Sequence, residues 1–252
     1  MRLDLIEPPQ AGKFSIATNL LRVRERIELA CARAGRDPSE VTLLPVTKTV
    51  GASRLREAIR AGLTSFGENK VQEAREKADL LTDTNVRWSV IGHLQSNKAK
   101  YVARFAHEFQ ALDRLAIADA LQRRLDIEDR TLDVFVQINA SGEDSKFGIP
   151  PEAASALVKA LAPYDRLHLK GLMTLAVFSG EEARVRECFK VMRCAQDQLR
   201  DVIADGQSVG ALSMGMSGDF EWAIEEGATV LRIGQAIFGP RSIPDSHYWP
   251  ER

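Results

Sequence analysis

The sequence has little cysteine and no long apolar run. Its three cysteines, Cys31, Cys188 and Cys194, are odd in number and form no Cys-x-x-Cys pair. Such usage argues against a disulfide framework and is typical of proteins of a reducing cytosol. No segment reaches transmembrane length, and residues 1–14 lack the apolar core of a signal peptide. The sequence therefore predicts a cytoplasmic protein with no membrane partner.

The chain also lacks an excess of charge of either sign. Its 34 Lys and Arg residues balance 35 Asp and Glu residues, which gives a formal net charge of −1. This balance provides no basic surface for nucleic acid, so no nucleic-acid partner is expected. His107, His168 and His247 show no metal-ligand spacing with cysteine or with each other. No metal site is predicted.

Short apolar segments recur along the chain and alternate with amphipathic ones. Most of them are short and are apolar or β-branched on both faces, as buried parallel strands are. The predicted strands are Val41–Thr47, Leu63–Phe66, Val86–Ile91, Glu108–Leu112, Leu132–Ile138, Leu167–Met173, Val209–Met214 and Thr229–Ile233. Eight strands separated by helices in 252 residues predict a (β/α)8 TIM barrel. An open doubly wound sheet is the alternative, because periodicity does not reveal closure.

No linker or low-complexity segment divides the chain, so residues 1–252 are expected to form a single domain, with 1–14 as a flexible tail. Apolar residues at three- and four-residue steps predict helices at Ser15–Ala34 and Glu181–Ile203.

Several residues are of types that begin or end helices. Gly35, Gly62 and Gly227 are expected at helix ends. Asp113 and Ser217 are expected to be N-caps.

Lys48 ends the first predicted strand, where a barrel places its chemistry. An amine at that position is expected to be poorly hydrated. A desolvated amine loses its proton more easily and can then attack an aldehyde to form an imine. By position alone, a salt-bridged or snorkelling lysine is the alternative.

The turns after the last two predicted strands form a candidate phosphate site. Ser217 lies where a helix begins, and the first amides of a helix bind anions. Arg232 and Gly234 lie in the turn after the last strand, and barrels often hold phosphate at these two loops. The carboxylate of Asp219 would repel a phosphate, so we expect it to face the first-turn amides of its own helix. Locally, Ser217 as a simple cap is equally consistent. Arg232 by itself favours a structural ion pair, and its two-residue spacing to Gly234 beside the Ser217 turn favours the site instead.

The segments that carry these residues resemble the pyridoxal 5′-phosphate homeostasis protein family. The resemblance runs from Val41 to Gly239 and rests on LLPVTKTV, FGENKVQEA, WSVIGHLQSNKAKYV, INASGEDSKFGI, LKGLMTLA and LSMGMSGDFEWAIEEGATVLRIGQAIFG. It implies a fold type III barrel like the N-terminal domain of alanine racemase, without the racemase's C-terminal β domain. It implies pyridoxal 5′-phosphate (PLP) bound covalently as a Schiff base to Lys48.

The resemblance also assigns the other side chains of the pocket. It places Ser217 and Gly234 at the phosphate and Arg232 at the pyridine nitrogen. The further cofactor-binding positions that it implies are Asn69, His93, Met173, Ser213 and Gln235. Local alternatives remain for two of them: Asn69 caps the helix that starts near Lys70, and His93 holds a loop by hydrogen bonds.

Two features of the predicted site favour binding without turnover. A permanently cationic Arg232 donates only to an unprotonated ring nitrogen, which makes the ring a poor electron sink. A racemase needs a second base on the opposite face of the cofactor, and the expected single domain supplies no equivalent of the tyrosine that serves in related racemases.

The sequence therefore predicts a monomeric carrier with no catalytic residues that serves intracellular PLP homeostasis. It would buffer PLP or deliver it to PLP-dependent apo-enzymes. The alternatives are a weak PLP-dependent amino-acid racemase, a Schiff-base aldolase acting on a phosphosugar, and an interaction protein in which PLP is vestigial.

Overall fold

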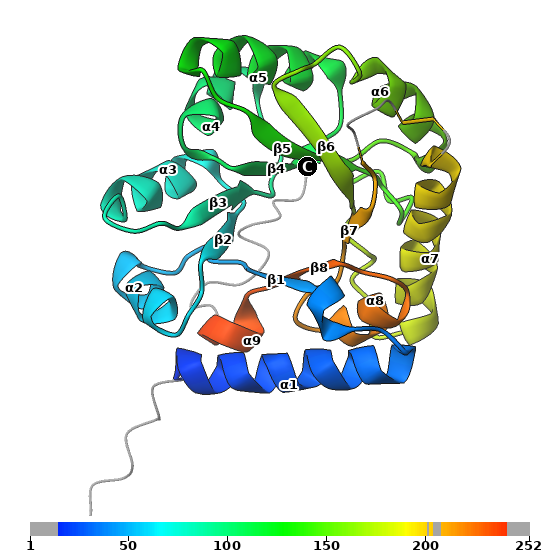
Figure 1. The fold of residues 1–252 in the computed structure, drawn as a ribbon. Coiled ribbons are helices and arrows are strands. Elements are labelled where there is room, and N and C mark those ends of the chain that lie inside the picture. Colours follow the sequence, from blue (N-terminus) through cyan, green and yellow to red (C-terminus); the bar gives the residue numbers. More distant parts are fainter. Residues whose placement is uncertain (1–14, 201, 204–207, 241–252) are drawn as a thin grey trace, which may run out of the picture.

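All strands of the described residues lie in one parallel sheet that curls into a ring with helices outside it (Figure 1). The computed structural model describes residues 15–200, 202–203 and 208–240, so the predicted tail at 1–14 and the C-terminal residues 241–252 lie outside it. The strands are β1 (Thr42–Pro45), β2 (Ser65–Glu68), β3 (Arg87–Val90), β4 (Glu108–Leu112), β5 (Leu132–Gln137), β6 (Leu167–Met173), β7 (Ala211–Ser213) and β8 (Val230–Ile233).

The ring closes between β1 and β2. The order is β1-β8-β7-β6-β5-β4-β3-β2, with β1 paired to β8 from Thr42 to Pro45. The two ends of this order meet at a single parallel bridge between Val46 and Gly67, where the Thr47 N–H also donates to the Gly67 carbonyl at 3.0 Å. The predicted (β/α)8 barrel is confirmed, and the open doubly wound alternative is wrong.

The helices cover the outside of the barrel (Figure 1). Their bounds are α1 (Ile16–Ala34), α2 (Ala52–Arg60), α3 (Val71–Leu80), α4 (Ala99–Phe105), α5 (Leu115–Glu128), α6 (Ala154–Ala160), α7 (Glu182–Leu199), α8 (Phe220–Glu225) and α9 (Gln235–Phe238), with 3-10 turns η1 (Pro38–Glu40), η2 (Ser96–Lys98) and η3 (Pro151–Ala153). The first helix begins and ends as predicted. Ser15 caps it through the Thr18 N–H, and Gly35 ends it in the left-handed region at φ 64°.

Three helix predictions are wrong in detail. α7 ends at Leu199, and Val202 and Ile203 lie half-buried outside the helix, so apolar spacing continues past the helix itself. Asp113 is not the N-cap of α5, because that position belongs to Arg114, whose guanidinium pairs with the Asp113 carboxylate at 2.6 Å. Ser217 is not the N-cap of α8 either, since that position belongs to Asp219.

Three features of the described residues bear on membrane spans, metal sites and disulfides. Within that part of the chain, none of the helices has the length and apolar character that a membrane crossing requires. The same residues contain no group of three His, Cys, Asp or Glu side chains placed to bind a metal ion. All three cysteines are free thiols, with Cys194 exposed and the other two buried.

Candidate functional site

Lys48 lies in a tight turn just beyond the end of β1. The turn runs from Thr47 to Val50 and is closed by the Val50 N–H, which donates to the Thr47 carbonyl at 2.9 Å. Thr47 is fully buried and Lys48 is half-buried. Thr49 has a φ of 68°, a left-handed conformation that a β-branched residue rarely adopts. The lysine is therefore held on a constrained turn at the carboxyl end of the barrel, although it does not belong to the strand itself.

The two turns of the predicted phosphate site do meet. The Ser217 hydroxyl, after β7, accepts a hydrogen bond of 3.3 Å from the Ala236 N–H, in the first turn of α9. At Gly234 an added Cβ would lie 2.9 Å from the Val46 carbonyl oxygen, so only glycine fits against β1 there. Within the described residues, the backbone N–H groups of Ser217, Gly218, Gly234 and Gln235 have no hydrogen-bond partner. Uncommitted amides in two adjoining turns suit an anion.

Asp219 differs from its predicted orientation. Its Oδ1 accepts from the Met216 N–H at 2.5 Å, which ties it to the preceding loop and not to the first-turn amides of α8. Burial raises the pKa of this carboxyl, and the Met216 hydrogen bond and the Arg232 charge act against that rise. The carboxylate is thus turned into its own loop.

Arg232 is buried beneath these turns, with 3% of its surface exposed. Its guanidinium donates to the Ser213 hydroxyl at 2.6 Å and to the Thr174 carbonyl at 2.5 Å. Burial lowers the pKa of Arg232 to about 10, against the opposing effect of Asp219, so the side chain is still a cation at neutral pH. The hydrogen-bond acceptors found for it among the described residues are neutral groups, which disfavours the structural ion pair.

A chain of polar side chains continues from Arg232 into the barrel. The Ser213 hydroxyl donates to Gln110 Oε1 at 2.7 Å, and Gln110 Nε2 donates to Glu108 Oε1 at 2.7 Å. Gln110 is fully buried, and sequence reasoning missed it. The available signal was a lone amide within the apolar strand EFQAL, because a buried polar group needs partners. Ser213 therefore orients Arg232 from the side of β7.

Asn69 and Met173 lie at the ends of their strands. Asn69 follows β2 and is half-buried, and α3 has Lys70 as its N-cap, so the capping alternative for Asn69 is wrong. Met173 ends β6 and is fully buried, and its carbonyl accepts from the Ile138 N–H at 2.8 Å. Their contacts with a cofactor stay a prediction.

His93 joins three loops. Its Nδ1 lies 3.5 Å from an Asp113 carboxylate oxygen, its Nε2 lies 3.4 Å from Arg114, and its ring stacks on Phe147 with centroids 4.1 Å apart. These contacts favour the loop-holding alternative that the sequence left open. A cofactor contact by His93 remains a prediction.

Gly92 is expected to be the least replaceable glycine of this region. An added Cβ would lie 2.2 Å from the Asn69 carbonyl oxygen, whereas at Gly180 it would meet nothing within 4 Å. Because the backbone of Asn69 must move, Gly92→Ala should lower the free energy of unfolding by about 1–3 kcal/mol. Urea unfolding measures this, with Gly180→Ala as the matched control. Equal stability of the two variants would contradict the close approach of these loops.

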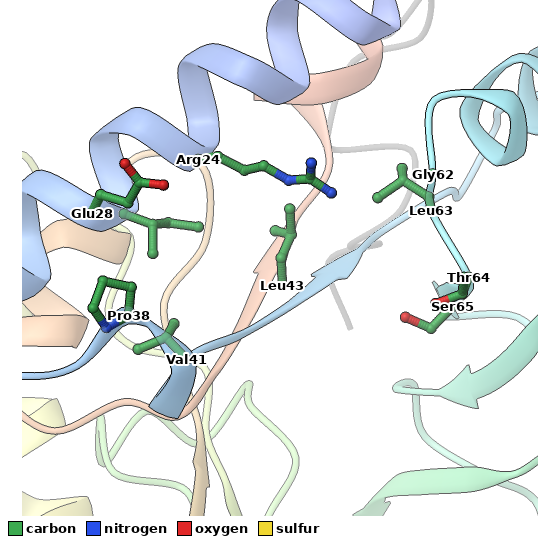
Figure 2. Close-up of a pocket in the computed structure, with 10 residues that line it drawn as sticks. Arg24, Glu28, Pro38, Val41, Leu43, Gly62, Leu63, Thr64 and Ser65 are labelled. Atoms are coloured by element: carbon green, nitrogen blue, oxygen red, sulfur yellow. The ribbon is translucent and has the colours of Figure 1, made fainter.

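A cavity of about 310 Å³ lies elsewhere, at the amino-terminal end of β1 and β2 (Figure 2). Arg24 and Glu28 of α1 border it beside Val41, Leu43 and Ser65. None of the predicted site residues lines it. It opens at the opposite end of the strands from Lys48, so it is separate from the candidate site.

Comparison with known proteins agrees with this geometry. The family described as "Alanine racemase, N-terminal domain" matches residues 18–242. A protein of Pseudomonas aeruginosa named pyridoxal phosphate homeostasis protein is 42% identical over 228 residues, which cover 90% of this chain and 96% of the relative. The protein of that name from Escherichia coli K12 is 42% identical over 229 residues, 90% of this chain and 97% of the relative.

A solved structure extends the comparison to three dimensions. PipY of Synechococcus elongatus PCC7942, solved with PLP bound, is 31% identical, has a TM-score of 0.78, and the match covers 89% of this chain and 100% of PipY. The fold and the sequence of this chain and of PipY agree along nearly the whole length of both proteins. The chain therefore belongs to the pyridoxal phosphate homeostasis protein family.

Proposed function

We propose that this protein binds PLP and serves PLP homeostasis by buffering the cofactor or delivering it to PLP-dependent apo-enzymes. The observation that carries the proposal is the placement of an amine beside an anion-binding turn. Val46, two residues before Lys48, contacts Gly234, whose turn joins that of Ser217. An aldehyde with a phosphate group matches such a pair of sites. The binding of PLP by the related PipY supports the same ligand.

Each residue has a role in this proposal. Lys48 attacks the aldehyde carbon, forms a C=N bond and releases water, so that PLP is held as a Schiff base. The hydroxyl of Ser217 and the amides of Gly234 and Gln235 bind the phosphate. Arg232 donates to the pyridine nitrogen from the orientation that Ser213 fixes. The remaining pocket residues, completing the wall of the site, are Asn69, His93 and Met173.

The charge of Arg232 favours a carrier over an enzyme. PLP supplies an electrophilic aldehyde and a ring that stabilises negative charge most strongly when its nitrogen is protonated. A guanidinium that stays cationic at neutral pH and only donates leaves that nitrogen unprotonated. The site then keeps the reversible chemistry of binding and loses most of the driving force for removing a substrate proton. We therefore propose no catalytic residue.

The proposed cellular location and partners rest on the cysteines and on the net charge. Free thiols without disulfides, described for all three cysteines, suit a reducing cytoplasm. We also propose a monomer, with neither nucleic acid nor membrane as a partner. A formal net charge of −1 supports the absence of a nucleic-acid surface.

Loading with PLP followed by reduction tests the proposal. The purified protein is incubated with PLP, freed of unbound cofactor, reduced with borohydride and digested. We expect a visible absorbance band before reduction and a single modified peptide that contains Lys48. A protein that stays colourless and unmodified at saturating PLP would overturn the proposed function.

A further inference from the structure

A charged cluster lies behind the Lys48 turn, between β2 and α3. The Lys77 ammonium donates to three oxygens: Glu68 Oε1 at 2.6 Å, Glu73 Oε1 at 2.7 Å and the backbone carbonyl of Thr47 at 2.6 Å. Lys77 is 7% exposed and Glu68 is fully buried. The cluster therefore connects α3 directly to the residue that precedes Lys48.

Both peptide groups of Lys48 are held by this cluster. Before Lys48, the Thr47 carbonyl accepts from Lys77. After it, the Thr49 N–H donates to Glu73 Oε1 at 2.7 Å. The left-handed φ of Thr49 is unfavourable for a β-branched residue, so contacts from outside the turn must keep it there. α3 supplies those contacts on both sides of the lysine.

We propose that Lys77 and Glu73 are positioning residues, which hold the Lys48 turn so that its amine is presented to the mouth of the barrel. The inference deepens the proposed function of Lys48 as the PLP-binding lysine and rests on it. Lys77 and Glu73 contact the turn at the Thr47 carbonyl and the Thr49 N–H. They act through the backbone of Thr47 and Thr49.

Burial of Glu68 in this cluster costs folding free energy. Its Oε1 accepts from Lys77 and from the Thr47 hydroxyl at 2.5 Å, but its buried Oε2 has no hydrogen-bond partner among the described residues. An unsatisfied buried carboxylate oxygen opposes folding, so packing alone does not account for it. An anchor that orients Lys77 towards the Thr47 carbonyl does account for it.

Labelling of Lys48 in the protein without PLP tests the inference. Acetic anhydride is applied over a range of pH, and acetylation of Lys48 is compared by peptide mass spectrometry with that of exposed Lys159 on α6. In Glu73→Ala the Thr49 N–H loses its acceptor, so the labelling profile of Lys48 should shift towards that of Lys159. The control Glu76→Ala removes an exposed carboxylate from the same helix and should leave the profile unchanged.

Two further measurements complete the test. Glu73→Gln keeps an acceptor oxygen for Thr49, so it should recover most of the wild-type profile. In PLP loading, Glu73→Ala should bind with roughly tenfold lower apparent affinity, as expected for losing one hydrogen bond to a charged acceptor. Glu73→Ala and Glu76→Ala profiles that coincide would overturn the inference.

The proposed function can fail separately. If wild-type protein does not load PLP while the Lys48 profile still shifts in Glu73→Ala, the PLP proposal is wrong and the positioning role of α3 stands.

Discussion

Lys48→Ala is expected to abolish borohydride-fixed PLP while the protein remains folded. Without the amine no C=N bond forms, so reduction has nothing to trap. The side chain is only half-buried and leaves a turn, so the loss of unfolding free energy should stay within about 1 kcal/mol. Intact mass after reduction and a thermal melt measure the two quantities. Weak binding should persist, because the turns of Ser217 and Gly234 are untouched.

Lys159→Ala is the matched control for this experiment. It removes an exposed lysine of α6. After borohydride reduction this variant should carry the same added PLP mass as the wild-type protein. An adduct that survives in Lys48→Ala at wild-type level would assign the cofactor to another lysine. The barrel would then still be a PLP-binding fold, but with its chemistry at a different position.

Lys77→Met is expected to destabilise the protein by about 3–5 kcal/mol, because it removes the cation shared by two carboxylates, one of them fully buried. The loss should be larger at about pH 8 than at about pH 6. Urea unfolding at both pH values measures it, with Lys159→Met as the control. A loss below about 1 kcal/mol at both values would show that the cluster contributes little.

The pH dependence follows from Glu68. Burial raises the pKa of its carboxyl to about 7, with Lys77 acting against the rise and Glu73 adding to it. The folded state therefore binds a proton that the unfolded chain has already released, and the contribution of Glu68 to stability falls as pH rises from about 4.5 to about 7. Without Lys77 the pKa rises further, so this decline extends to higher pH. Lys77→Met therefore loses the most unfolding free energy, relative to wild type, in alkaline solution.

Periodicity predicted the positions of all eight strands, because most of them are short apolar or β-branched segments bounded by helical ones. It missed where β2 ends, since Gly67 and Glu68 look like a polar strand end while the strand continues through them. The partner that makes a buried Glu68 possible, Lys77, comes from the following helix. Tertiary pairing of this kind leaves no local signal in the sequence.

For the candidate site, too, the sequence predicted the positions of the loops but not the contacts between distant segments. Ser217 and Gly234 were placed in adjoining turns from barrel geometry alone, and the structure joins them. The helix-cap prediction for Ser217 was wrong because its hydroxyl bonds to α9, a contact between segments far apart in the chain. Gln110 and Glu73 were missed for the same reason, since their roles depend on side chains that only the fold brings together.

Next to Lys48 the barrel is joined weakly, since β1 and β2 meet through one bridge at Val46 and Gly67. If a ligand contacts both Lys48 and Asn69, it spans this seam and fastens the two edges of the sheet. Occupancy and closure would then be linked, so the loaded form would resist local opening by a margin that grows with free PLP concentration. In a cofactor buffer built in this way, the resistance of the barrel to local opening would rise with the fraction of the protein that holds PLP.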